Sequence, residues 1–151
     1  MVPESTSAER NTAALCHLVS IPLPFLGPIF FLATQRRSKF VVLHAAQALF
    51  EAIILSSVLF VATAISVIIS LSKVWEAIQT RGESLTWSLL WETLIKAGAT
   101  WVILGVISAF YFVSSLLDAR RASQGKWKGS LISGPLARRA TKQLTGLTGS
   151  R

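Results

Sequence analysis

The chain has 151 residues, of which 52% are hydrophobic and only 15% are charged, whereas an ordinary soluble domain carries about 25% charged residues. This length allows one domain at most, and it is too short to bury helices that are apolar on every side within a soluble core. The formal net charge of +8 lies beside apolar segments, so we expect it to face anionic lipid headgroups and not nucleic acid.

A polar segment, residues 1–12, precedes the first apolar stretch, residues 13–34. It lacks the basic start and the small-residue cleavage site of a signal peptide, so we expect the apolar stretch to stay in the mature protein. Pro22, Pro24 and Pro28 interrupt the helical hydrogen bonds of this stretch, and in lipid the freed carbonyls need partners. A kinked span, which we favour, and a re-entrant hairpin both satisfy this need.

A short basic link with Arg36, Arg37 and Lys39 leads to the second apolar segment, residues 41–71, whose only charged side chain is Glu51. The segment is long enough to cross about 30 Å of hydrocarbon, which takes ~20 helical residues. Because basic residues in short flanks stay on the cytoplasmic side of a membrane, the link is predicted to face the cytoplasm.

Three polar side chains, His44, Gln47 and Glu51, stand at the head of this second segment. At 100° per residue they fall within an arc of about 60° on one helix face. An ionisable group in a span is costly, so Glu51 needs a partner. The candidates near the same leaflet are Arg36, Arg37, Arg120 and Arg121. Two interpretations stay open: a clamp that holds the second span against the third, or a functional role in handling protons or gripping a partner.

The connection after this segment carries an amphipathic helix, predicted over residues 85–96. Its apolar side chains recur at helical spacing, at Trp87, Leu90, Trp91, Leu94 and Ile95. Tryptophan prefers the headgroup level, so we expect Trp87 and Trp91 to lie at the outer membrane surface, either as a simple aromatic belt or as a surface for a partner.

Residues 97–117, which contain no charged residue, form the third predicted span. Gly105 and Ala109 make a small-xxx-small pair that allows close helix contact. The tail, residues 118–151, is basic and rich in Gly, Ser and Thr, and this composition predicts a disordered cytoplasmic segment. Its predicted membrane-surface residues are Arg120, Arg121 and Trp127.

The sequence shows no motif for catalysis, a cofactor or a metal. Cys16 and His17 are neighbours, so on a helix they point about 100° apart, with no third group to orient them. His17 and His44 occur without the HExxH or CxxC spacing that marks many metal sites. We therefore expect a non-enzymatic protein that uses neither a cofactor nor a metal.

Three stretches in the first part of the chain carry a recognisable pattern: AALCHL (13–18), LGPIFFL (26–32) and KFVVLHAAQALFE (39–51). They resemble the Tic20-like family, small bacterial membrane proteins related to a subunit of the chloroplast inner-envelope protein translocon. The matching positions are His17, Gly27, Pro28, Phe40, His44, Gln47, Ala48 and Leu49. The resemblance implies a helical bundle integral to the bacterial cytoplasmic membrane, with Gly27 and Pro28 at a packing or partner-binding surface.

The predicted fold class is an all-α integral membrane protein: a small bundle of three apolar helical segments, the first broken by proline, plus an amphipathic interfacial helix. The predicted function is that of an accessory, assembly or translocation-related subunit of a membrane complex. Its partners would be the lipid bilayer and either other membrane subunits or further copies of itself, bound through the Gly105 and Ala109 face. The alternative is an oligomeric transporter or channel component, in which the proline-broken segment and the His44, Gln47 and Glu51 stripe line a path.

Overall fold

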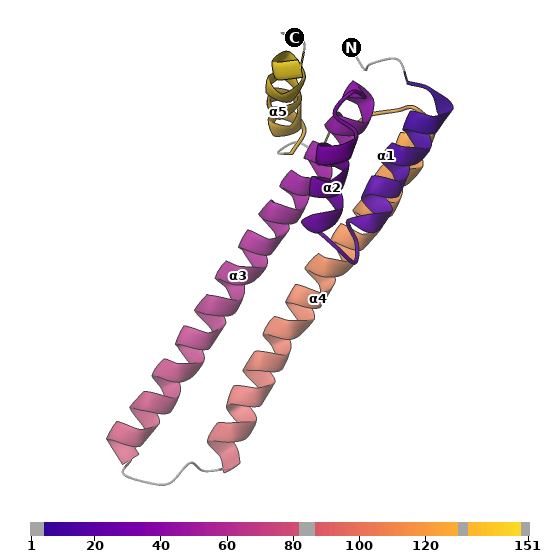
Figure 1. The fold of residues 1–151 in the computed structure, drawn as a ribbon. Coiled ribbons are helices and arrows are strands. Elements are labelled where there is room, and N and C mark those ends of the chain that lie inside the picture. Colours follow the sequence, from indigo (N-terminus) through magenta and orange to yellow (C-terminus); the bar gives the residue numbers. More distant parts are fainter. Residues whose placement is uncertain (1–4, 82–86, 130–132, 149–151) are drawn as a thin grey trace. The chain divides into compact units, whose positions relative to one another are not determined.

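The computed structural model describes residues 5–81, 87–129 and 133–148, and these residues contain helices and no strand. The helices are α1 (Ser7–Val19), α2 (Leu26–Thr34), α3 (Lys39–Arg81), α4 (Trp87–Ser123) and α5 (Ser133–Thr148), as Figure 1 shows. The chain divides into two compact units. The first unit comprises Met1–Ile54 and Tyr111–Arg151, and the second comprises Leu55–Phe110.

Helix α1 begins at a capping box. The Thr6 side chain accepts a hydrogen bond from the Glu9 N–H, and the Glu9 carboxylate accepts one from the Thr6 N–H at 2.8 Å. These bonds satisfy amide donors that every helix start leaves without an intrahelical partner. Hydrogen bonds from the Ser38 side chain and from the Thr6 backbone hold the pKa of Glu9 below its usual value of 4.5.

The first apolar stretch forms two short helices and not one span. Helices α1 and α2 have 13 and 9 residues, and each is shorter than the ~20 residues that a span needs. The prolines explain the break: Pro22 and Pro24 lie in the turn between the helices, and Pro28 lies in the first turn of α2, where its missing N–H costs little. The expected bundle of three spanning segments is therefore not confirmed.

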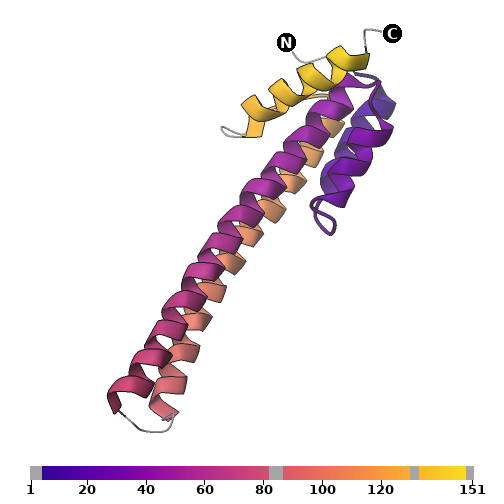
Figure 2. The ribbon, with the colours of Figure 1, turned by 60° about the vertical axis from the view of Figure 1, so that its left-hand side comes forward.

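Close packing of α1 on α2 depends on Gly27. A Cβ atom at this position would lie 3.0 Å from Cγ1 of Val19 and 3.2 Å from the Val19 carbonyl carbon and oxygen. Pro28, next in the chain, is almost fully buried. The Gly-Pro pair therefore lets the start of α2 approach the end of α1, as Figures 1 and 2 show.

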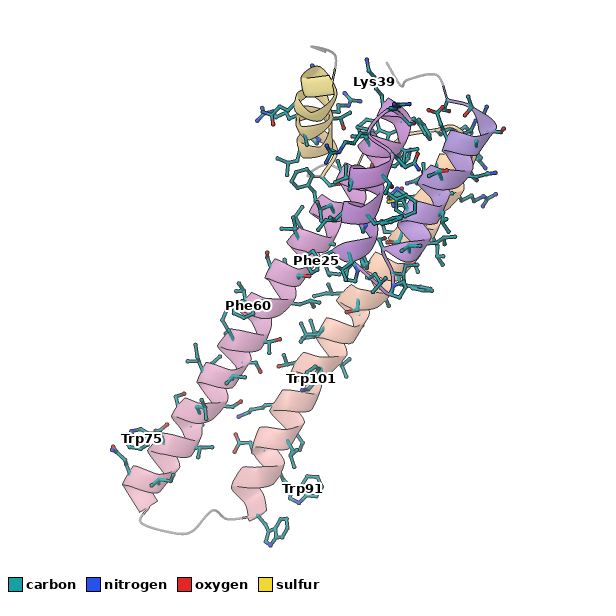
Figure 3. All side chains as sticks on the ribbon, viewed as in Figure 1. Phe25, Lys39, Phe60, Trp75, Trp91 and Trp101 are labelled. Atoms are coloured by element: carbon teal, nitrogen blue, oxygen red, sulfur yellow. The ribbon has the colours of Figure 1, made fainter. Side chains whose placement is uncertain are left out.

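Two helices among the residues that the structure describes are long and apolar enough to cross a membrane by length and composition, over Lys39–Glu76 and Leu94–Ser123. In the second unit their large apolar side chains are exposed: 74% of Phe60 and 67% of Trp101 are accessible. Figure 3 shows these residues, with Trp75 and Trp91, projecting from α3 and α4. A helix that is apolar on its exposed sides is suited to lipid and not to water.

Helix α4 runs without interruption from Trp87, so the interfacial helix predicted over residues 85–96 is the beginning of α4 and not a separate element. Residues 85 and 86 of that prediction lie outside the described residues. No proline occurs in α4, and Gly98 alone does not end a helix. Within the second unit α3 and α4 lie side by side (Figure 2), joined by a 3.2 Å hydrogen bond between the hydroxyls of Ser66 and Thr100.

The tail was predicted to be disordered, but α4 continues to Ser123 and α5 follows in the first unit. Ala137 of α5 is fully buried and packs with Leu43 and Ala46 of α3. The Arg138 guanidinium lies 4.5 Å from the ring centroid of Trp127, a cation–π contact. Composition alone predicted disorder because small alanines supply the buried face of this helix, and they add little to a hydrophobic pattern.

Candidate functional site

The first unit is built around small and aromatic residues from α1, α2, α3 and α4. Its buried core contains Ala13, Cys16, Phe31, Phe40, Val41, Ala45, Ala48 and Ala122. Alanines at half of these positions allow the helix backbones to approach closely, so polar side chains on the same faces meet one another. Burial raises the pKa of Cys16 to about 12, and its thiol therefore stays protonated at neutral pH.

The two histidines of the chain lie together in this unit. Nε2 of His17 and Nδ1 of His44 are 3.0 Å apart and share one hydrogen bond, and the two rings meet edge to face. His17 is 0% exposed and His44 is 2% exposed. Burial lowers the pKa of His17 to about 4, so this ring is neutral at pH 7. No sequence pattern pairs these two residues, because they come from different helices.

Gln47 connects α3 to α4. Its Nε2 donates to Oε1 of Glu51 at 3.0 Å and to Oδ2 of Asp118 at 3.2 Å. The Ser133 hydroxyl, at the start of α5, donates to the same Glu51 oxygen at 2.9 Å. Arg121 forms an ion pair with Oδ1 of Asp118 at 2.9 Å. Helices α3, α4 and α5 therefore share one polar network.

The network differs from the predicted pairing of Glu51 with an arginine. Among the described residues Glu51 bonds to Gln47 and Ser133, while Arg121 pairs with Asp118, which lies one helical turn before it. Sequence reasoning missed both Asp118 and Ser133. Asp118 offered a signal, since it is the first charged residue after the charge-free run 97–117 and an arginine follows at helical spacing.

Three of these residues could hold a metal ion together. One nitrogen of His17 and one carboxylate oxygen from each of Glu51 and Asp118 lie within 4.8 Å of one another. Three buried polar atoms at the site have no hydrogen-bond partner among the described residues: Nδ1 of His17, Nε2 of His44 and Oε1 of Gln47. The sequence predicted no metal site, because motif spacing within one segment cannot reveal ligands from α1, α3 and α4. We call the seven residues His17, His44, Gln47, Glu51, Asp118, Arg121 and Ser133 the polar cluster.

Comparison with known families identifies the chain. The sequence profile of the magnetosome magnetite crystal formation protein family matches residues 8–136. The chain belongs to this family. The match overturns the resemblance to the Tic20-like family, which rested on short motifs near the start of the chain. Those motifs combine small residues, a Gly-Pro pair and a polar stripe, and small residues and polar side chains are common wherever membrane helices pack closely. Searches of curated proteins and of solved structures each found no match.

The family match and the two apolar helices together indicate a membrane protein. All residues of the polar cluster lie within the matched range, which extends through α4 to the start of α5. The site therefore lies inside the region that matches the magnetosome family and not in a segment outside it.

The other predicted site residues of this family member are not members of the polar cluster. In the second unit Gly105 and Ala109 are exposed, and a Cβ atom at Gly105 would meet no other atom within 4 Å. In the first unit Arg36, Arg37 and Lys39 are exposed around the start of α3, and Figure 3 labels Lys39 there. Arg120 is exposed on α4, while Trp87 and Trp91 are 78% and 61% exposed. These positions are accessible to lipid or to a partner.

A second polar feature lies within the second unit, between α3 and α4. A cavity of about 410 Å³ is lined by residues that include Ser66, Lys73, Lys96 and Thr100. Glu92, also in the lining, pairs with Lys96 one helical turn along α4. Hydrogen bonding to Lys96 holds the pKa of Glu92 below its usual range, so this carboxylate is charged at neutral pH. Both partners are exposed, and such a pair contributes little to stability.

Proposed function

We propose that this chain is a non-enzymatic integral membrane subunit that acts in magnetite crystal formation, at the membrane that surrounds the growing crystal. The observation that carries this proposal is the family match over residues 8–136. Helices α3 and α4 would anchor the chain in the bilayer through their exposed apolar surfaces. The first unit, with the polar cluster at its centre, would be the part that acts.

The hydrogen bonds of the polar cluster support an assembly role. Gln47 ties α3 to α4 and Ser133 ties α5 to α3, so the first unit would present a fixed surface to other components of the membrane. The exposed face with Gly105 and Ala109 remains the proposed contact with a neighbouring helix, from another subunit or from a second copy of this chain.

Burial of the stripe favours this role over a transporter or channel. His44 and Gln47 are 2% and 1% exposed, and they face α1 and α4 within one unit. A transport path requires side chains that line a water-filled passage, and fully buried groups bonded to neighbouring helices do not supply one.

Removal of the gene from a magnetite-forming cell that carries it tests the proposal. We expect fewer or smaller crystals by electron microscopy, and recovery when the unmodified gene is returned. A tagged chain should co-purify with the membranes that enclose crystals. Crystals of unchanged size and number, together with a tagged chain that is absent from those membranes, would contradict the proposed function.

A further inference from the structure

The polar cluster holds more negative than positive charge. Glu51 and Asp118 contribute two carboxylates, and within the part of the chain that the structure describes Arg121 is the one cationic side chain that an ion pair places beside them. Asp118 is only 5% exposed. A carboxylate removed from water without a counter-charge is unfavourable by several kcal/mol, so such a group either takes up a proton or acquires a cation.

The Glu51 carboxylate can accept more hydrogen bonds than the two it receives. Oε1 of Glu51 accepts hydrogen bonds from both Gln47 and Ser133. Neither of these two bonds involves Oε2 of the same carboxylate. An ionised carboxylate has about four lone-pair positions, and the bonds to Glu51 occupy about half of them. The carboxylates therefore keep oxygen lone pairs for a further ligand.

The histidine pair can contribute a nitrogen ligand, because one ring nitrogen of His17 lies within 4.8 Å of the Glu51 and Asp118 oxygens. If Nε2–H of His17 donates to Nδ1 of His44, Nδ1 of His17 is the unprotonated nitrogen of its ring. This atom is fully buried and has no hydrogen-bond partner among the described residues. A metal-binding histidine almost always donates its second ring N–H to a neighbouring acceptor, and His44 is that acceptor here.

We propose that His17, Glu51 and Asp118 bind one divalent cation of a first-row transition metal, with His44 and Gln47 as positioning residues. The three ligand atoms lie within 4.8 Å of one another, so modest side-chain rotation brings each to the metal–ligand distance of about 2.1 Å. One imidazole nitrogen with two carboxylate oxygens suits Mn²⁺, Fe²⁺, Co²⁺ or Zn²⁺, whereas Mg²⁺ and Ca²⁺ prefer oxygen alone.

Binding would join α1, α3 and α4 through one ion, since each ligand comes from a different helix. The proposal rests on this geometry and not on the proposed role in crystal formation. Metal binding by the purified chain and crystal growth in cells can therefore succeed or fail separately.

Titration of the purified full-length chain with Mn²⁺ tests the site. The chain should be prepared in detergent or lipid nanodiscs with an affinity tag that contains no histidine. Electron paramagnetic resonance of the free ion should show about one Mn²⁺ bound per chain. We expect Glu51→Gln and Asp118→Asn each to weaken binding at least tenfold. Glu92→Gln, the same change at an exposed carboxylate outside the polar cluster, should bind as the unmodified chain does.

A second measurement needs no substitution. The chain contains only two histidines, so their ring-proton signals in a nuclear magnetic resonance spectrum report on this site alone. Substoichiometric Mn²⁺, which is paramagnetic, should broaden these signals, and an equal concentration of Mg²⁺ should not reverse the broadening. Absence of broadening, or equal Mn²⁺ binding by Asp118→Asn and Glu92→Gln, would overturn the proposal and would leave the polar cluster as a hydrogen-bonded clamp between helices. Reversal by Mg²⁺ would also overturn it, because the site would then have no preference for a transition metal.

Discussion

Substitution of Gly27 by alanine should loosen the packing of α1 on α2. The new Cβ would lie 3.0 Å from Cγ1 of Val19 and 3.2 Å from the Val19 carbonyl group, which is backbone and cannot rotate away. Overpacking of this kind costs ~1–3 kcal/mol. Alanine recovers part of this cost through its better helix propensity, worth at most ~1 kcal/mol. The net destabilisation of the helix pair is therefore expected to be about 1–2 kcal/mol.

Cys16 reports this change directly. It is the only cysteine of the chain, it is 0% exposed in α1, and burial raises its pKa to about 12, so a thiol reagent reaches it only when α1 separates from its neighbours. If opening is fast compared with labelling, a loss of 1–2 kcal/mol raises the labelling rate by a factor of about 5–30. The labelling rate can be followed by mass spectrometry of the purified chain in lipid nanodiscs.

Gly105→Ala is the matched control, because a Cβ atom at Gly105 would meet no other atom within 4 Å. We expect this variant to label Cys16 at the unmodified rate. If Gly27→Ala also labels at that rate, the close contact between α2 and Val19 does not hold the helix pair together, and the reasoning is refuted.

Two further changes test the first unit. Gln47→Leu keeps the side-chain volume but removes the donor to Glu51 and Asp118. Because hydrogen bonds to charged groups are each worth ~1.5–3 kcal/mol, we expect the free energy of unfolding in a denaturant titration to fall by at least about 2 kcal/mol. An unchanged denaturation midpoint would argue against the network. The pKa of Glu9 is lowered when α1 is folded, so its stabilising effect is present above pH 4.5 and is lost as the pH falls through the lowered folded-state value. Helicity of α1, followed by amide hydrogen exchange, should therefore decrease on acidification below pH 4.5, and Glu9→Gln should show the reduced protection already at neutral pH.

Hydropathy and charge predicted the parts of the fold that depend on local sequence. The apolar runs at 41–71 and 97–117 correspond to the interior of α3 and α4, and the prolines of the first stretch marked the turn between α1 and α2. The sequence favours a kinked span over a re-entrant hairpin for this stretch, whereas the structure has two short helices; a proline-interrupted segment can continue as a kinked helix or reverse direction. The close contact of Gly27 with Val19, which packs the two helices together, joins residues whose proximity no local pattern specifies.

The polar cluster could be predicted only in part. Periodicity placed His44, Gln47 and Glu51 on one face, since that is a property of one helix. Their partners Asp118 and Ser133 are 71 and 82 residues away from Gln47 and Glu51 respectively, and no local pattern specifies contacts over such separations. The Tic20-like resemblance failed for a related reason: its motifs describe local helix packing, which unrelated membrane proteins share.

The most direct test of the central claim is crystal size in magnetite-forming cells whose own gene has been exchanged for a variant. Asp118→Asn removes a charge from the polar cluster, and Glu92→Gln removes one from the second unit; both should be compared at matched protein levels in the membrane. If the first unit acts in crystal formation, cells with Asp118→Asn should resemble the gene deletion, while cells with Glu92→Gln should form normal crystals. Normal crystals with both variants, despite a clear effect of the deletion, would contradict the assignment of this role to the polar cluster.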